Sequence, residues 1–184
     1  SENATSEYIK DSIISLIDIL INDDPSDLIT VLASPFINIS FKDIVEIKDK
    51  IEQDNITDIN DLKKINSMKH FFGIYDSFKN NSMSMYKGFG ILFNNYLLPT
   101  AITLGKDQFL TTNDIYNSIV EFFETSVLKD YNDITTYIQI SSEVSEMMIG
   151  DNDSKVKLHT VHSAKGKQFD AVIYVPKKTK PSRI

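Results

Sequence analysis

Regular spacing of apolar side chains is the feature that most limits the folds open to this chain. Over about the first 150 residues, apolar residues recur three and four positions apart, with charged or amide side chains between them. Between residues 7 and 21 the apolar positions include Ile9, Ile13, Leu16, Ile17 and Leu20. This period places them on one face of an α-helix, so residues 7–148 are predicted to be mainly helical.

Capping residues and helix breakers predict where the individual helices begin and end. Ser40 is a candidate N-cap, because its hydroxyl oxygen can accept a hydrogen bond from an amide of the first turn. Pro99 is expected to end a helix, residues 104–110 to form a loop around Gly105, and Thr112 or Asn113 to cap the next helix. The predicted helical segments are 7–21, 26–32, 41–53, 59–78 with a break near residue 66, 84–98, 112–128 and 133–148.

The pattern changes after residue 154. Polar and apolar residues alternate from Val156, and Ala171 to Val175 form a continuous apolar run after a turn at Gly166. This pattern predicts a strand, a short turn and a buried strand. Two strands do not make a stable sheet alone. The chain is therefore predicted to be mainly α, with residues 1–154 helical and residues 155–184 contributing a small β unit to a larger parallel α/β domain.

Composition and charge exclude several classes of protein. There is no cysteine, which excludes disulfides and thiolate chemistry, and with three histidines a histidine metal site is not expected. No apolar run is long enough to span a membrane, and no signal peptide is evident, so a cytoplasmic location is expected. The net charge of −7 divides unevenly, with 25 of 26 acidic residues before residue 155 and eight of 19 basic residues from residue 155 onward. A basic end on an acidic body suggests that this end contacts a polyanion, although a solubilising terminus has the same composition.

The usual sequence marks of catalysis are missing. The pairs Gly105-Lys106 and Gly166-Lys167 are not followed by the hydroxyl residue that a phosphate-binding P-loop requires. Asp-Glu of the Walker B kind is absent, and Arg183 is the only arginine. No catalytic residue and no metal site is therefore predicted within the chain itself.

One segment carries groups suited to nucleic acid. Residues 156–175 read VKLHTVHSAKGKQFDAVIYV, which brings together Thr160, His162, Ser163, Lys165 and Gly166 at a predicted strand end and turn. Hydroxyl, imidazole and ammonium groups and exposed backbone amides are the donors that bind a phosphodiester backbone. A charged hairpin-like loop without a ligand is the alternative that spacing alone leaves open.

This segment resembles motif V of superfamily 1 helicases of the UvrD/Rep type. Eight of the eleven positions from 160 to 170 match that motif, namely Thr160, His162, Ser163, Ala164, Lys165, Gly166, Phe169 and Asp170. A second segment, LITVLASPFINISFKDI at residues 28–44, is similar to the Ser-Pro-Phe region early in the helical 2B insertion of the same proteins. The sequence departs from motif V at His159, Lys167 and Gln168, where the family usually has Met, Leu and Glu.

The resemblance implies a helical 2B-like insertion domain followed by the start of the second segment of the RecA-like motor domain 2A. It implies that Thr160, His162, Ser163 and Lys165 contact DNA, and that Gly166 and Gln168 couple DNA to the nucleotide. It also implies a longer parent protein that binds ATP and Mg²⁺ through its other motor domain, hydrolyses ATP and translocates 3′ to 5′ on single-stranded DNA to unwind duplex. This chain alone is expected to be inactive, because it lacks the Walker A and B motifs.

Two other interpretations stay open. The parent could be a helicase–nuclease subunit of the RecB or AddA type, which shares both segments and would carry a nuclease domain. The chain could instead be a non-catalytic helical module that binds a protein partner and retains a relic of motif V. In either case DNA or a protein partner of the helical domain is expected, and a membrane is not.

Overall fold

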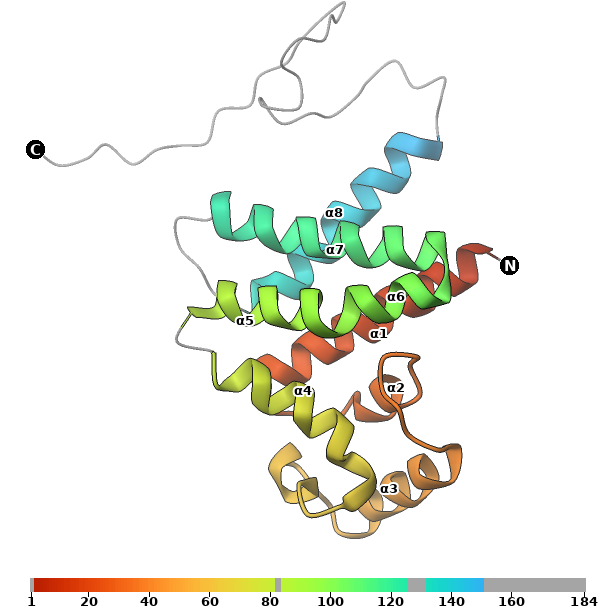
Figure 1. Ribbon diagram of the computed structural model, residues 1–184, viewed down its shortest axis with the longest axis vertical. Helices are drawn as coiled ribbons and strands as arrows, with labels where there is room; N and C mark the ends of the chain where they lie inside the picture. The colour runs from red at the N-terminus through yellow and green to blue at the C-terminus, as the bar shows by residue number, and fades with distance from the viewer. Residues whose placement is uncertain (1, 82–83, 126–131, 151–184) are drawn as a thin grey trace, which may run out of the picture. The chain divides into compact units, whose positions relative to one another are not determined.

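The computed structural model of the chain describes residues 2–81, 84–125 and 132–150. The chain divides into two compact units, Ser1–Ser145 and Glu146–Ile184, and the fold below is that of the first. Its elements, drawn in Figure 1, are α1 (Glu2–Asn22), α2 (Leu28–Leu32), α3 (Phe41–Gln53), the 3₁₀ turns η1 (Ile59–Leu62) and η2 (Asn66–Met68), α4 (Lys69–Lys79), α5 (Met85–Leu92), the π-helical turn η4 (Phe93–Leu97), α6 (Leu98–Leu104), α7 (Lys106–Thr125) and α8 (Asp133–Gly150).

The prediction of a mainly helical chain is confirmed, since the described ranges contain helices and turns and no strand. The predicted β unit at 155–184 and the boundary at residue 154 lie outside those ranges and stay predictions. Within the same ranges, no helix combines the length and the apolar character that crossing a membrane requires.

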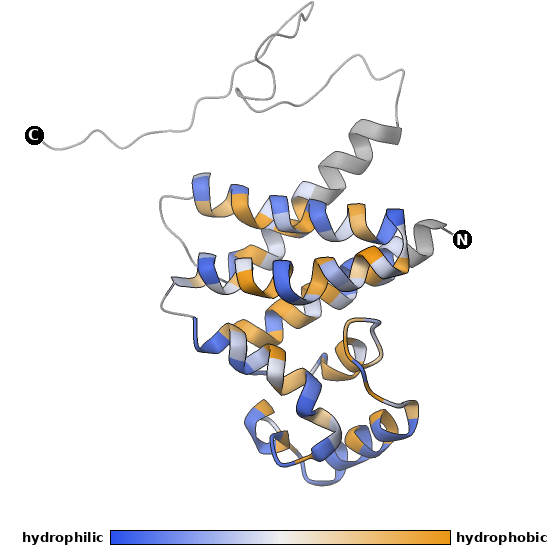
Figure 2. Cartoon of the chain, viewed as in Figure 1, coloured by the Kyte–Doolittle hydropathy of each residue, from blue (hydrophilic) through white to orange (hydrophobic). Residues whose placement is uncertain are grey.

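Helix α1 is the centre of the unit. It contacts α2, α4 and α7, and Ile13, Ile17 and Leu20 on its inner face are fully buried. Figure 2 shows hydrophobic and hydrophilic residues alternating along the helices, as expected for amphipathic helices that pack around a shared core. Burial of each large aliphatic side chain contributes about 1.5–3 kcal/mol, so α1 supplies much of the stability of the core.

The beginning of α3 follows the prediction. The hydroxyl oxygen of Ser40 accepts a hydrogen bond from the Asp43 amide at 3.1 Å and donates one to the Asp43 carboxylate at 2.5 Å. Ile44 and Ile47 point into the core, whereas Phe41 and Val45 are exposed. Helix α3 packs on α2, and these two helices bound the pocket described below.

Two of the predicted helical segments need correction. The segment 59–78 is interrupted near residue 66, as predicted, but the part before the interruption is not an α-helix: 3₁₀ turns occupy 59–62 and 66–68, and the α-helix begins only at Lys69. The helix predicted over 84–98 does not end at Pro99, because helical structure continues to Leu104. The π turn η4 ends at Leu97, two residues before Pro99, and the Leu98 amide donates to the Phe93 carbonyl five residues back. This wider turn shifts the hydrogen-bond register just before Pro99, which has no amide hydrogen to donate.

The loop predicted at 104–110 is reduced to one residue. Helix α6 ends at Leu104 and α7 begins at Lys106, so only Gly105 separates them. Gly105 has φ +140° and ψ 176°, a conformation that is essentially restricted to glycine. Thr112, a predicted cap, lies fully buried inside α7 instead and donates its hydroxyl hydrogen to the Gln108 carbonyl at 2.8 Å.

Aromatic side chains fill the core between α4, α5 and α7. The rings of Phe78 and Phe89 meet edge to face with their centroids 5.1 Å apart, and Phe93 stacks on Tyr116 at 4.9 Å. Phe78, Phe89 and Phe93 are all fully buried. The helical spacing of these aromatic residues therefore marks core positions. Tyr86, which is half exposed, is an exception.

Candidate functional site

All predicted site residues lie outside the residues that the structure describes. Thr160, His162, Ser163 and Lys165, expected to bind DNA, and Gly166 and Gln168, expected to couple to nucleotide, fall within 151–184. Their geometry is therefore not part of the fold above, and their roles stay predictions. The described part of the chain contributes the Ser-Pro-Phe segment, a pocket between α2 and α3 and a polar cluster at the end of α1.

The Ser-Pro-Phe segment forms a buried corner after α2. Ser34 is buried and donates its hydroxyl hydrogen to the Val31 carbonyl at 2.6 Å, and Phe36 lies in the core. The Tyr8 hydroxyl donates to the Ala33 carbonyl at 2.7 Å and so ties the corner to α1. Here the described structure gives Ser34 and Phe36 structural contacts with the core.

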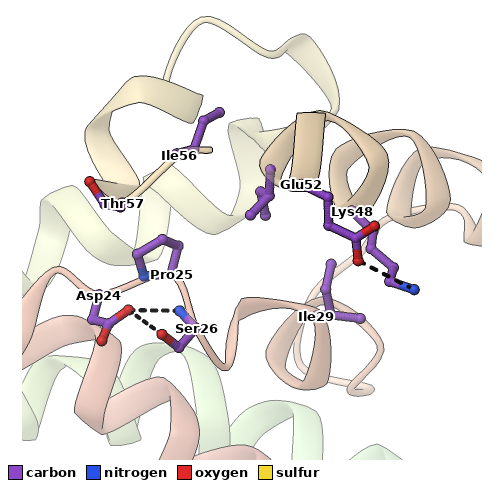
Figure 3. A pocket seen from close by; sticks show the side chains of 9 residues that line it. Asp24, Pro25, Ser26, Ile29, Lys48, Glu52, Ile56 and Thr57 are labelled. Carbon is purple, nitrogen blue, oxygen red and sulfur yellow. Dashed lines mark hydrogen bonds and ion pairs between the residues drawn. The ribbon is translucent and has the colours of Figure 1, made fainter. Parts of the chain in front are cut away.

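A pocket of about 560 Å³ is lined by residues of α2, α3 and two loops (Figure 3). It lies between α2, the second half of α3 and the two loops around residues 25 and 56. Pro25, Ile29, Ile51 and Ile56 provide apolar walls. The polar residues that line it are Asp24, Ser26, Lys48, Glu52 and Thr57.

Both carboxylates that line the pocket have partners. Asp24 Oδ1 accepts hydrogen bonds from the Ser26 hydroxyl at 2.5 Å and the Ser26 amide at 2.9 Å. The Ser26 hydroxyl, and then its amide, lower the pKa of Asp24, so this group is ionised at neutral pH. Glu52 pairs with Lys48 at 3.6 Å. Both interactions are visible as dashed lines in Figure 3.

A polar cluster joins the end of α1 to α4. Asp23 Oδ1 accepts a hydrogen bond from the Tyr75 hydroxyl at 2.6 Å and pairs with Lys79 Nζ at 2.7 Å. Lys79 also lies 5.3 Å from the centroid of the Tyr75 ring. Burial raises the pKa of Tyr75 well above its usual range, and the Asp23 carboxylate raises it further.

The backbone at Asp23 is bent into the same cluster. Asp23 has φ 62°, a left-handed conformation that is uncommon outside glycine and is most tolerated by Asn and Asp. Its carbonyl accepts the Ile59 amide at 3.1 Å. Asp23 thereby connects the end of α1 to the 3₁₀ turn η1 and to α4, which points to a structural role for the cluster.

The described residues offer no alternative metal or histidine site. Within those residues no group of three or more His, Asp or Glu side chains is placed to hold a metal ion. His70 is exposed, and its Nδ1 accepts a hydrogen bond from the Asn38 amide at 3.1 Å. In this structure His70 therefore fixes the backbone that follows the Ser-Pro-Phe corner.

The sequence pattern does not indicate the pocket, because residues 24–29, 48–52 and 56–57 meet only in the folded chain. The only local sequence feature that relates to the pocket is the turn predicted at Asn22-Asp23-Asp24-Pro25. Comparison of the chain with protein-family models, with curated proteins and with solved structures finds no match.

Proposed function

We propose that this chain is part of an ATP-dependent DNA helicase of the UvrD/Rep type, which translocates 3′ to 5′ along single-stranded DNA. The observation that carries the proposal is the motif V-like segment, with eight matching residues among the eleven from Thr160 to Asp170. In this proposal residues 1–154 are the 2B-like insertion, and residues 155–184 begin the second segment of the RecA-like domain 2A.

Two further observations support the proposal. The described residues are helical, as a 2B-like insertion requires. The basic residues are concentrated after residue 154, next to the motif, whereas the preceding residues are acidic. Phosphate binding is driven by such local positive charge and weakens steeply with salt.

The proposed roles follow the chemistry of each side chain. Thr160 and His162 are two positions apart, so on a strand both project from one face, where they would donate hydrogen bonds to the phosphate backbone. Ser163 and Lys165 add a hydroxyl and an ammonium donor. Gly166 provides the turn, and Gln168 would accept a hydrogen bond from the nucleotide sugar through its amide oxygen.

In this proposal ATP and Mg²⁺ bind outside this chain. Its sequence has no phosphate-binding loop that ends in Lys and a hydroxyl residue, and the described residues hold no cluster of metal-binding side chains. We therefore assign both ligands to the other motor domain of a longer protein.

Binding of single-stranded DNA tests the proposal. Fluorescence anisotropy of a fluorescein-labelled oligothymidylate would be measured over a range of salt concentrations for the wild-type chain, His162→Ala and the matched control His159→Ala. Loss of a hydrogen bond to a charged phosphate costs about 1.5–3 kcal/mol, so His162→Ala should weaken binding by about tenfold or more. On the predicted strand His159 would project from the opposite face, so its substitution should have little effect.

Two results would contradict the proposal. One is equal weakening by His159→Ala and His162→Ala, which would indicate non-specific attraction to the basic end. The other is binding by the wild-type chain that does not depend on salt, because phosphate contacts release counterions.

A further inference from the structure

We infer that the pocket between α2 and α3 is a docking site for a short protein segment that carries an apolar anchor side chain flanked by Lys or Arg. The inference concerns a protein partner of the helical unit and is independent of the proposed DNA contacts at residues 160–168. Three features of the described residues support it: the pocket itself, the charge around it and the exposed face of α3.

The pocket has the size and lining of a recognition site. Its volume of about 560 Å³ lies within the range of about 300–1,000 Å³ that is typical of binding pockets. Ile29, Ile51 and Ile56 come from three different segments and all line the pocket; Ile29 and Ile56 are labelled in Figure 3. All three are only partly buried in the free chain, so an apolar side chain seated there would remove additional hydrophobic surface from water.

The charge around the pocket selects the partner. Segment 23–58, which contains the residues that line the pocket, includes Asp23, already paired with Lys79, and eight other carboxylates. It carries three lysines. Each of these lysines is paired within the same helix or its cap, in the pairs Lys42–Glu46, Lys48–Glu52 and Lys50–Asp54. The remaining negative charge disfavours nucleic acid and acidic peptides and attracts a basic segment.

The exposed face of α3 extends the apolar surface beyond the pocket. Phe41 is 81% exposed and Val45 is 42% exposed. Positions 41, 45, 48 and 52 share one helix face, so Phe41 and Val45 continue the line of Lys48 and Glu52, which line the pocket. A segment seated in the pocket and extending along α3 would cover both exposed side chains.

Peptide selection tests the inference even while the partner is unidentified. Phage-displayed random dodecapeptides would be selected on the wild-type chain and counter-selected on Thr57→Trp, which replaces an exposed pocket-lining side chain with a much larger one. The inference predicts selected peptides with an apolar residue between Lys or Arg residues. It is wrong if the selection yields no peptides that distinguish the two proteins, or if it yields acidic peptides.

A matched pair of charge reversals tests the site. Glu52 and Glu46 both have side chains 63% exposed and both pair with a lysine four residues earlier, at 3.6 and 3.7 Å, but only Glu52 lines the pocket. For a selected peptide labelled with fluorescein, Glu52→Lys should weaken binding by about tenfold, and Glu46→Lys by less than about twofold.

Folding controls, the comparison of the two charge reversals and competition with oligothymidylate together decide the outcome. Far-UV circular dichroism and thermal unfolding of each variant establish that the fold is retained. Equal weakening by the two reversals would overturn the inference, because it would indicate attraction to the acidic body as a whole. Unchanged oligothymidylate binding by Glu52→Lys separates this site from the proposed DNA site, whereas peptide displacement by oligothymidylate would also overturn the inference.

Discussion

Gly105 holds the connection between α6 and α7, and its replacement by alanine should destabilise the helical unit. With φ +140° and ψ 176°, the residue occupies a region where a side chain costs about 1–3 kcal/mol. An added Cβ would also lie 2.8 Å from Gln108 Oε1. That atom is the end of a flexible side chain and can move away, so the backbone conformation should supply most of the cost.

Urea unfolding followed by far-UV circular dichroism measures this cost. We expect Gly105→Ala to lower the free energy of unfolding by about 1–3 kcal/mol, which for a chain of this size corresponds to a fall of about 2–12 °C in Tm. The double variant Gly105→Ala/Gln108→Ala should recover little of the loss, because it removes the steric contact and leaves the strained backbone.

Gly73 is the matched control. It is an exposed glycine within α4, and a Cβ added there meets nothing within 4 Å. Gly73→Ala should therefore raise the free energy of unfolding by about 0.5–1 kcal/mol. The reasoning about Gly105 is refuted if Gly105→Ala is as stable as the wild-type chain, or if Gln108→Ala restores all of the lost stability.

Two further predictions concern the polar cluster and catalysis. Tyr75→Phe removes the hydrogen bond to the Asp23 carboxylate and should cost about 1.5–3 kcal/mol in urea unfolding. Because the folded-state pKa of Tyr75 is raised, the stability that Tyr75 contributes is fully present below the unfolded tyrosine pKa of about 10 and is lost as the pH rises further. Tyr75→Phe should therefore flatten the alkaline fall in stability. An equal fall in both proteins would contradict the assignment. The chain should also show no ATP hydrolysis with or without single-stranded DNA in a phosphate-release assay, since it lacks a P-loop; turnover that persists through repurification would disprove this.

The sequence predicts helices well where spacing and caps act locally. Ser40 caps α3 as expected, because the hydroxyl, the Asp43 amide and the Asp43 carboxylate lie within four residues. The predicted ends near Pro99 and Gly105 are wrong for different reasons. Pro99 is accommodated by a π turn that no local propensity signals, and Gly105 alone makes the turn for which the sequence predicts a seven-residue loop.

The motif V segment and the pocket differ in whether the sequence indicates them. Motif V is identified from its residues, and those residues lie outside the described ranges, so that prediction is unchanged by the structure. The pocket depends on Asp24, Ile29, Ile51 and Thr57 meeting in space. The packing of α3 on α2 and of the loops beside them brings these residues together. The spacing of residues along the chain does not predict this packing.

The π turn before Pro99 has a consequence for sequence change in this part of the chain. A π turn holds one more residue than the α-helical turn it replaces, so η4 behaves as a one-residue insertion within the helical run from Met85 to Leu104. Loss of one residue between 93 and 97 would leave the helix phase intact on both sides, with Phe89 and Ala101 still facing the core. Pro99 would then stand inside a regular α-helix, where its ring costs about 3 kcal/mol. A shortened variant is therefore expected to be tolerated only when position 99 changes with it, which makes the length of this turn and the identity of residue 99 a coupled pair.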